Sequence, residues 1–183
     1  MPSEFCRPRS RPVLSLALTA LMVSSLVTAA DPLLPAAQAP AAPTCLLAVQ
    51  GEQAPAGLDK FLGQVVYVDF WASWCGPCRQ SFPFMNQLQS ALGAKGLTVV
   101  AINLDEEATD AQTFLASHAA SFKVASGANQ ACASSFHVEA MPSSYLIDRA
   151  GKVRYIHHGF RAGDAELLQG LAASLVAEPA AAP

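Results

Sequence analysis

The 183-residue chain carries little charge: only 14% of its residues are Asp, Glu, Lys or Arg, and the formal net charge is −3. Lys and Arg gather nowhere into the basic stripe that a nucleic-acid-binding surface needs, so nucleic acid is excluded as a partner. No glycine-rich phosphate-binding motif is present, and we therefore expect no small-molecule cofactor. The sequence also has no internal repeat, and its 52% hydrophobic content suits one globular domain with appendages.

Pairs of metal ligands are equally scarce. Cys75 and Cys78 form the only C-x-x-C pair, and a structural zinc site would need a second pair of ligands. His157 and His158 are adjacent and cannot readily both bind one ion. We therefore expect no metal site. Three interpretations of the cysteine pair stay open: a redox-active pair, half of a zinc site, and a purely structural disulfide.

The N-terminus has the pattern of an export signal. Three arginines lie among the first 11 residues, and residues 13–30 are then apolar and uncharged, ending in Ala29-Ala30. This pattern predicts a signal peptide over residues 1–30, cleaved after Ala29 or Ala30. An uncleaved anchor is the alternative, because about 18 apolar residues are just enough to span a bilayer.

Composition divides the rest of the chain. Residues 31–44 are almost all Ala and Pro and predict a semi-extended linker. Residues 45–177 form the predicted folded domain, and residues 178–183 a disordered tail. Export places this domain in the periplasm, or on the inner membrane if the leading segment stays attached.

Disulfides persist outside the cytoplasm, so the cysteine count matters. Once Cys6 leaves with the signal peptide, four cysteines remain. If Cys75 pairs with Cys78, Cys45 and Cys132 are left for a structural disulfide. The alternative for these two is a pair of separate buried thiols, each acting as a small apolar side chain.

The C-x-x-C pair lies between two well-defined elements. Residues 65–71 are rich in β-branched and aromatic side chains and predict a buried strand, and residues 79–92 predict a helix. The helix start favours negative charge, so Cys75 should ionise more readily than a free thiol. Gly76 allows the turn, and Pro77 has no N–H to lose there.

The remaining pattern alternates strands and helices. Strands separated by helices pair in parallel, whereas two strands joined by a short turn pair antiparallel. The sequence therefore predicts an α/β fold with a mixed central sheet and helices on both faces. The predicted strands are 45–49, 97–104, 122–124, 143–148 and 153–158 beside 65–71, and the further helices are 58–62, 111–118, 129–136 and 162–177.

With this order of strands and helices around the C-x-x-C pair, the chain resembles thioredoxin-fold proteins. It is most similar to the exported TlpA-like (ResA-like or DsbE-like) thiol–disulfide oxidoreductases. The resemblance covers residues 45–177. It is carried by Val-Asp-Phe-Trp-Ala-Ser-Trp-Cys-Gly-Pro-Cys at 68–78, Pro83 in the following helix, Met141-Pro142 before a strand, and Tyr-Leu-Ile-Asp-Arg-Ala-Gly-Lys at 145–152.

The resemblance implies a role for each matching residue. Cys75 would be the attacking thiolate and Cys78 the resolving thiol, with Pro142 as a cis-proline facing the pair. Asp69 would be a buried carboxylate that takes a proton from Cys78, because burial raises the pKa of a carboxyl. The alternative for Asp69 is a strand residue whose carboxylate reaches water. The predicted substrate-binding residues are Trp74, Gly76, Pro77 and Met141.

Three positions depart from the pattern of this family. Ala101 stands where cytoplasmic thioredoxins place a lysine, and Ser143 follows the proline where threonine is common. Ser81 stands where some reductive TlpA-like proteins carry a glutamate. These departures leave the handling of protons and the direction of electron flow open.

The resulting hypothesis is an exported, monomeric enzyme that reduces protein disulfides. Its reduced form would be restored by a membrane thiol donor. The resemblance implies substrates such as apocytochrome c, in cytochrome c maturation, or copper-delivery proteins. Two alternatives remain: an oxidase of the same fold, and a Cu(I)-binding module in which Met141 assists the two thiolates.

Overall fold

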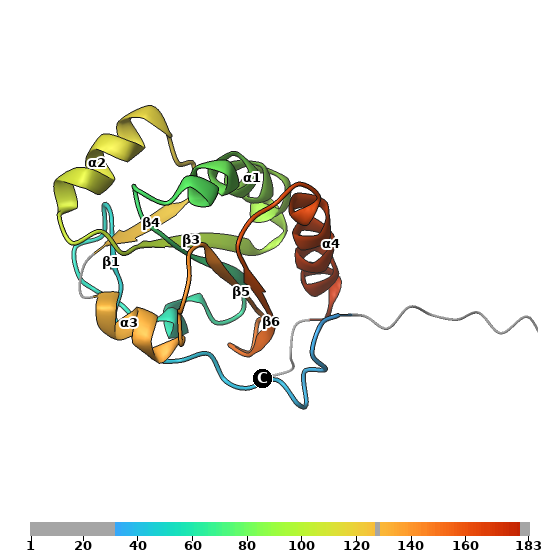
Figure 1. Ribbon diagram of the computed structural model, residues 1–183. Coiled ribbons are helices and arrows are strands. Elements are labelled where there is room, and N and C mark those ends of the chain that lie inside the picture. The colour runs from blue at the N-terminus through green and yellow to red at the C-terminus, as the bar shows by residue number, and fades with distance from the viewer. Residues whose placement is uncertain (1–31, 127–128, 180–183) are drawn as a thin grey trace, which may run out of the picture. The chain divides into compact units, whose positions relative to one another are not determined.

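A computed structural model of the chain describes residues 32–126 and 129–179. Within these residues, six strands form one mixed sheet in the order β1-β4-β3-β2-β5-β6 (Figure 1). The strands are β1 (Ala48–Val49), β2 (Val65–Trp71), β3 (Leu97–Asn103), β4 (Lys123–Ser126), β5 (Ser143–Ile147) and β6 (Val153–His158). The helices are α1 (Gly76–Leu92), α2 (Ala108–Ser117), α3 (Asn129–Ser135) and α4 (Asp164–Ala177), with short 3-10 turns at Leu58–Phe61 and Gly93–Lys95.

The two central strands are buried along their whole length. Strands β2, β3 and β4 run parallel, whereas β5 pairs antiparallel with β2 and with β6. All seven residues of β2 and all seven of β3 are buried. Apolar side chains on both faces of a strand require cover on both faces of the sheet, and this explains the continuous apolar runs in the sequence.

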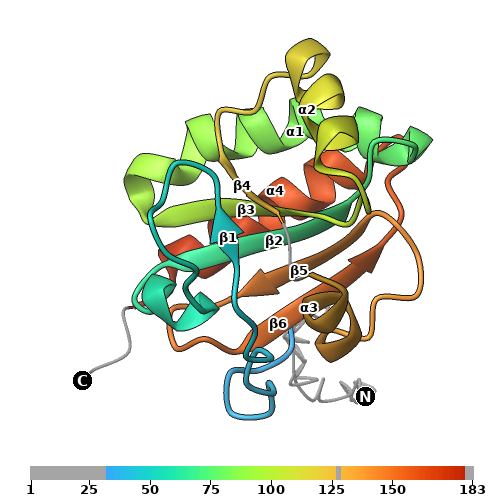
Figure 2. The same cartoon turned by 90° about the vertical axis from the view of Figure 1, so that its left-hand side faces the viewer.

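Alternate side chains of β2 point into two separate cores. Tyr67 and Trp71 belong to a cluster that includes residues of α1, α2 and α4, whereas Val66 and Val68 belong to a second cluster on the other face. Figure 2 shows α1, α2 and α4 on one side of the sheet and α3 on the other. The predicted mixed sheet with helices on both faces is confirmed.

Helix α1 begins earlier than the sequence predicts. The expected start is residue 79, but the helix begins at Gly76, with Cys75 as its N-cap. Pro77 lies in the first turn, where its missing N–H breaks no intrahelical hydrogen bond, so the motif itself becomes helical. Both cysteines are therefore part of the helix start.

The segment before Cys45 packs against the domain, which differs from the linker that its composition predicts. Leu33 and Ala39 are buried, and the Leu34 N–H donates to the carbonyl of Arg154 at 2.8 Å. The Val153 N–H likewise donates to the carbonyl of Pro40. Backbone hydrogen bonds to β6 thus hold a segment that has few large apolar side chains, and the folded unit starts before residue 45.

A buried arginine joins this segment to the C-terminal end. Arg154 is 5% exposed and pairs with Glu178 at 2.8 Å and with Asp148 at 3.3 Å, and it also donates to the carbonyl of Leu34. Glu178, the first residue of the predicted tail, is therefore bound to the domain. The predicted signal peptide at 1–30 and residues 180–183 of the predicted tail lie outside the described residues. Within residues 32–126 and 129–179, no helix combines the length and hydropathy needed to cross a membrane.

Candidate active site

A disulfide joins Cys75 and Cys78 at the start of α1. The sulfur of Cys75 accepts a hydrogen bond from the Cys78 backbone N–H at 3.2 Å. This N–H is one of the donors that the first turn of a helix leaves without a backbone partner, so it would also stabilise a thiolate on Cys75. Cys75 is 4% exposed and Cys78 is fully buried, which leaves Cys75 as the sulfur that a partner can reach.

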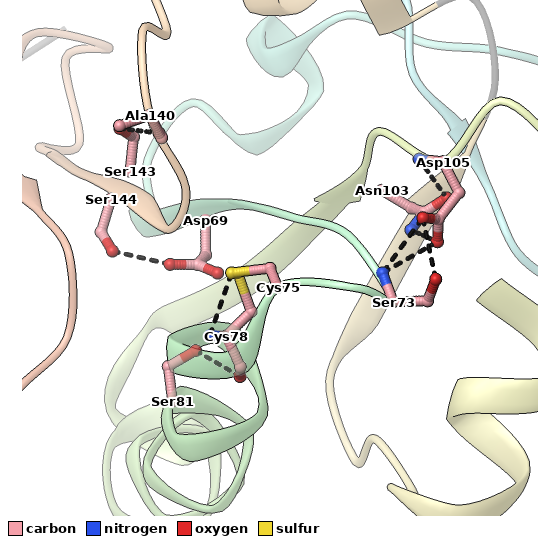
Figure 3. Close-up of a disulfide and its surroundings, with 10 residues drawn as sticks. All are labelled: Asp69, Ser73, Cys75, Cys78, Ser81, Asn103, Asp105, Ala140, Ser143 and Ser144. Atoms are coloured by element: carbon pink, nitrogen blue, oxygen red, sulfur yellow. Dashed lines mark hydrogen bonds between the residues drawn. A yellow bond between two sulfur atoms is a disulfide. The ribbon is translucent and has the colours of Figure 1, made fainter. Parts of the chain in front are cut away.

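An acidic residue after β3 fixes the turn before the cysteines. The Asp105 carboxylate accepts the Ser73 backbone N–H at 3.0 Å and the Ser73 hydroxyl at 3.0 Å (Figure 3). The Asn103 side-chain amide donates to Asp105 Oδ2 at 2.8 Å, the oxygen that also accepts the Ser73 N–H. These bonds hold the turn from Ala72 to Cys75, and thereby the direction in which α1 starts.

No local pattern predicts this contact. Acidic residues that come just before a helix are most simply explained by the helix dipole, and the acidic residues at 105–110 precede the predicted helix 111–118. The strand order could have indicated it. Because β2 and β3 run parallel, Ser73 and Asp105, which follow these strands, lie at the same edge of the sheet. An acceptor after one strand can then meet the free N–H groups after the other.

The Met141–Pro142 peptide bond is cis, as the resemblance implies. Pro142 directly precedes β5, whose first residue, Ser143, pairs with Phe70 near the end of β2. The proline therefore lies at the same sheet edge as the cysteine pair. Its carbonyl accepts the Gly159 N–H at 2.8 Å, which joins the proline turn to the turn after β6.

Asp69 is a fully buried carboxyl on β2, on the face covered by α1. Its Oδ1 atom accepts a hydrogen bond from the Ser144 hydroxyl at 2.6 Å, whereas Oδ2 has no hydrogen-bond partner among the described residues. Burial raises the pKa of Asp69 from 3.8 to about 7, although the Ser144 hydrogen bond acts in the opposite direction. Figure 3 shows the carboxylate turned toward the disulfide. The structure thus favours the buried group over a carboxylate that reaches water.

This pKa predicts how stability depends on pH. Between pH 3.8 and about 7 the folded protein holds the Asp69 proton and the unfolded chain has released it. The free energy of unfolding should therefore fall as pH rises through this range, by roughly 4 kcal/mol from this group. Asp69→Asn should remove that part of the pH dependence and gain stability relative to wild type at pH 8. Urea unfolding of the oxidised proteins at pH 5 and pH 8 measures the part of this fall that lies above pH 5, about 3 kcal/mol.

The matched control is Asp110→Asn, because Asp110 is an exposed carboxylate at the start of α2. We expect this variant to follow the wild-type pH dependence. If Asp69→Asn also follows it, Asp69 does not hold a proton in the folded protein at neutral pH.

The four predicted substrate-binding residues differ in exposure. Trp74 is 71% exposed, Gly76 and Pro77 are exposed, and Met141 is half-buried against the core cluster that contains both cysteines. An exposed indole next to an otherwise covered disulfide can provide apolar contact area for a protein partner. The assignment of these four residues to substrate binding stays a prediction.

The positions that depart from the family pattern also lie near the site. Ala101 pairs with Asp69 across β2 and β3, so that neighbour brings no charge to the carboxyl. The Ser81 hydroxyl is buried and donates to the carbonyl of Cys78 at 2.9 Å. Ser143 donates to the carbonyl of Ala140 at 2.7 Å, inside the proline turn.

A second disulfide joins Cys45 and Cys132. Cys132 is fully buried and belongs to the core cluster on the α3 face of the sheet, away from the cluster that holds Cys75 and Cys78. This bond ties the chain before β1 to α3. Over residues 32–126 and 129–179, no cluster of three or more His, Cys, Asp or Glu side chains could hold a metal ion.

A mixed sheet with a Cys-Gly-Pro-Cys disulfide at a helix start and a cis-proline at the same sheet edge defines a thioredoxin-fold protein. The Redoxin family model matches residues 29–171, and the chain belongs to this family. The similarity to TlpA-like, ResA-like and DsbE-like proteins that the sequence predicts is confirmed.

Individual relatives agree with this placement. The thiol-disulfide oxidoreductase ResA of Bacillus anthracis is 34% identical over 96 residues, which are 52% of this chain and 56% of that protein. ResA of Bacillus subtilis is 29% identical over 96 residues, 52% of this chain and 54% of that protein. The chain thus spans little more than half the length of these curated relatives.

A solved structure matches over more of its length. The crystal structure of a putative thiol:disulfide interchange protein DsbE from Chlorobium tepidum is 46% identical, with a TM-score of 0.71. The match covers 75% of this chain and 96% of that one.

Proposed function

We propose that this protein is an exported thiol–disulfide oxidoreductase that reduces protein disulfides through Cys75 and Cys78. The observation that carries the proposal is the disulfide at the start of α1 with a buried, partly unpartnered carboxyl on the strand behind it. The helix start favours a thiolate on Cys75, and Asp69 provides a proton acceptor at neutral pH.

The proposed reaction has two exchange steps. In the first, the Cys75 thiolate attacks one sulfur of a substrate disulfide, a mixed disulfide forms, and the other substrate sulfur leaves as a thiolate that is protonated by water. In the second, the Cys78 thiol gives its proton to Asp69 while its sulfur attacks Cys75. The Cys75–Cys78 disulfide forms, and the second substrate sulfur leaves with the electron pair. Two electrons pass from the dithiol to the substrate.

The residues around the disulfide also offer a surface to which a protein substrate could bind. Trp74 and Met141 offer apolar contacts, and the backbone of Met141, beside Pro142, can pair with an extended substrate segment. Gly76 and Pro77 lie exposed between the cysteines and leave room for that segment. We propose this surface as the binding site for disulfide-containing proteins.

Localisation and partners follow from the N-terminal pattern and the family. A signal peptide at residues 1–30 would deliver the domain to the periplasm, or an uncleaved segment would anchor it to the inner membrane. Since that compartment is oxidising, a membrane thiol donor would restore the dithiol. Apocytochrome c and copper-delivery proteins are the proposed substrates, and we propose that the enzyme acts as a monomer.

Reduction of insulin by dithiothreitol tests the activity. The protein is expected to accelerate the precipitation of the insulin B chain, because Cys75 and Cys78 pass electrons to the insulin disulfides faster than dithiothreitol does alone. A rate equal to that of dithiothreitol alone would contradict the proposal.

A further inference from the structure

Three buried polar groups form a short chain on the face of the sheet that α1 and α4 cover. The Tyr67 hydroxyl donates to the Ser144 hydroxyl at 2.8 Å, and Ser144 donates to Asp69 Oδ1 at 2.6 Å. Tyr67 and Asp69 are fully buried, and Ser144 is 3% exposed. Because Ser144 pairs with Asp69 across β2 and β5, the sheet itself holds the two side chains together.

The chemistry of these groups fixes the direction of the chain. Burial raises the pKa of Tyr67 well above its usual value, so its hydroxyl stays protonated and donates. The Ser144 oxygen accepts the hydrogen bond from Tyr67, and the Ser144 hydroxyl donates its own hydrogen to the Asp69 carboxyl. Asp69 Oδ1 is therefore occupied as an acceptor, whether or not the carboxyl is ionised, and Oδ2 is the oxygen left for a proton.

We propose that Ser144, held by Tyr67, is a positioning residue that reserves Asp69 Oδ2 for the proton of Cys78. The inference rests on the proposed function, because it assigns an atom to the proton that leaves Cys78 in the second exchange step. As Cys78 attacks Cys75, its proton moves to Oδ2 and the substrate sulfur departs with the electron pair of the broken bond. Ser144 gains and loses no proton in this step.

Among the groups around Asp69, Ser144 is the side chain that lowers the pKa of the carboxyl. On β3 the residue opposite Asp69 is Ala101, which has no charge. On β6 the residue opposite Ser144 is His157, whose Nε2 lies 3.0 Å from Asp164 Oδ2. The titratable side chains on this side of the sheet include Tyr67 on β2, Cys75 and Cys78 at the start of α1, Tyr155 and His157 on β6, and Asp164 at the start of α4.

The test follows the second exchange step directly. One equivalent of 5,5′-dithiobis(2-nitrobenzoate) reacts with the reduced protein in two phases: Cys75 releases the first thionitrobenzoate anion, and Cys78 releases the second. In wild type the rate of the second phase should rise with pH, with a midpoint near 7 that reports Asp69. Ser144→Ala removes a donor to the carboxylate, so its midpoint should move up by about one pH unit while the first phase is unchanged.

Three further variants make the result specific. Ser144→Thr keeps the hydroxyl and should restore the wild-type midpoint, and Tyr67→Phe should move it upward by less than Ser144→Ala does. Ser143→Ala makes the same change one residue away, where the hydroxyl donates to the Ala140 carbonyl and lies 3.1 Å from His158 Nδ1, and it should leave the midpoint in place. Unfolding curves for each variant show that it is folded.

Two outcomes are distinguishable. If wild type shows the pH step, Asp69→Asn abolishes it, and Ser144→Ala leaves the midpoint where it is, the role of Ser144 is overturned and the proposed enzyme stands. If wild type releases no second thionitrobenzoate, Cys78 does not resolve the mixed disulfide, and the proposed function and this inference both fail.

Discussion

Cys75→Ser is expected to lower the protein-dependent part of the insulin reduction rate by about 1,000-fold, so that the observed rate equals that of dithiothreitol alone. The attacking atom is the sulfur at the start of α1, where the Cys78 N–H points at it. A serine hydroxyl at this place ionises far less readily and cannot form a disulfide. Turbidity of the released insulin B chain measures the rate.

The partner cysteine should behave differently. Cys78→Ser keeps the attacking thiolate but loses the resolving sulfur, so the variant should accumulate as a mixed disulfide with its substrate. A gel without reductant shows this adduct, which Cys75→Ser cannot form. If Cys75→Ser reduces insulin as fast as wild type, the sulfur at this position is not the nucleophile.

Removal of the second disulfide is expected to cost about 2–5 kcal/mol of unfolding free energy. The cross-link spans a sequence separation of 87 residues, so it restricts a large part of the unfolded chain. In the folded protein it also fixes the chain before β1 to the buried side of α3. The variant is Cys45→Ala with Cys132→Ala, so that no thiol is left free, and urea unfolding of oxidised protein measures the loss.

A matched control distinguishes the contributions of the two disulfides to stability. Cys75→Ala with Cys78→Ala removes a bond with a sequence separation of 3, and it should cost much less unfolding free energy, because so short a loop restricts the unfolded chain little. The variant without Cys45 and Cys132 should still reduce insulin, since those residues belong to the other core cluster. Equal unfolding midpoints for this variant and wild type would show that the bond does not stabilise the fold.

Local patterns predicted the central part of the fold well. The apolar run of β2 has the bounds 65–71 both in the sequence analysis and in the structure, because β-branched and aromatic residues fill a strand that is buried on both faces. The start of α1 was predicted three residues late, since Gly76 and Pro77 suit a turn as well as a first helical turn.

The contacts that hold the site together could not be read from local patterns. Ser73 and Asp105 are 32 residues apart, and Asp69 and Ser144 are 75 apart. Each pair meets only because neighbouring strands bring it to one edge or one face of the sheet. Composition fails for residues 32–44 for a related reason: backbone hydrogen bonds to β6 hold that segment, and composition does not show which backbone groups find partners in the fold.

The redox potential of the Cys75–Cys78 couple tests the central claim most directly. Oxidised protein is equilibrated with mixtures of reduced and oxidised dithiothreitol or glutathione, and the fraction of dithiol at Cys75 and Cys78 is counted after alkylation. We expect one reversible two-electron transition with a potential below about −200 mV, in the reducing half of the range that thioredoxin-fold proteins cover. A potential of about −120 mV would contradict the reductase by making the protein an oxidant, and the absence of a reversible transition at these two cysteines would contradict the enzyme itself.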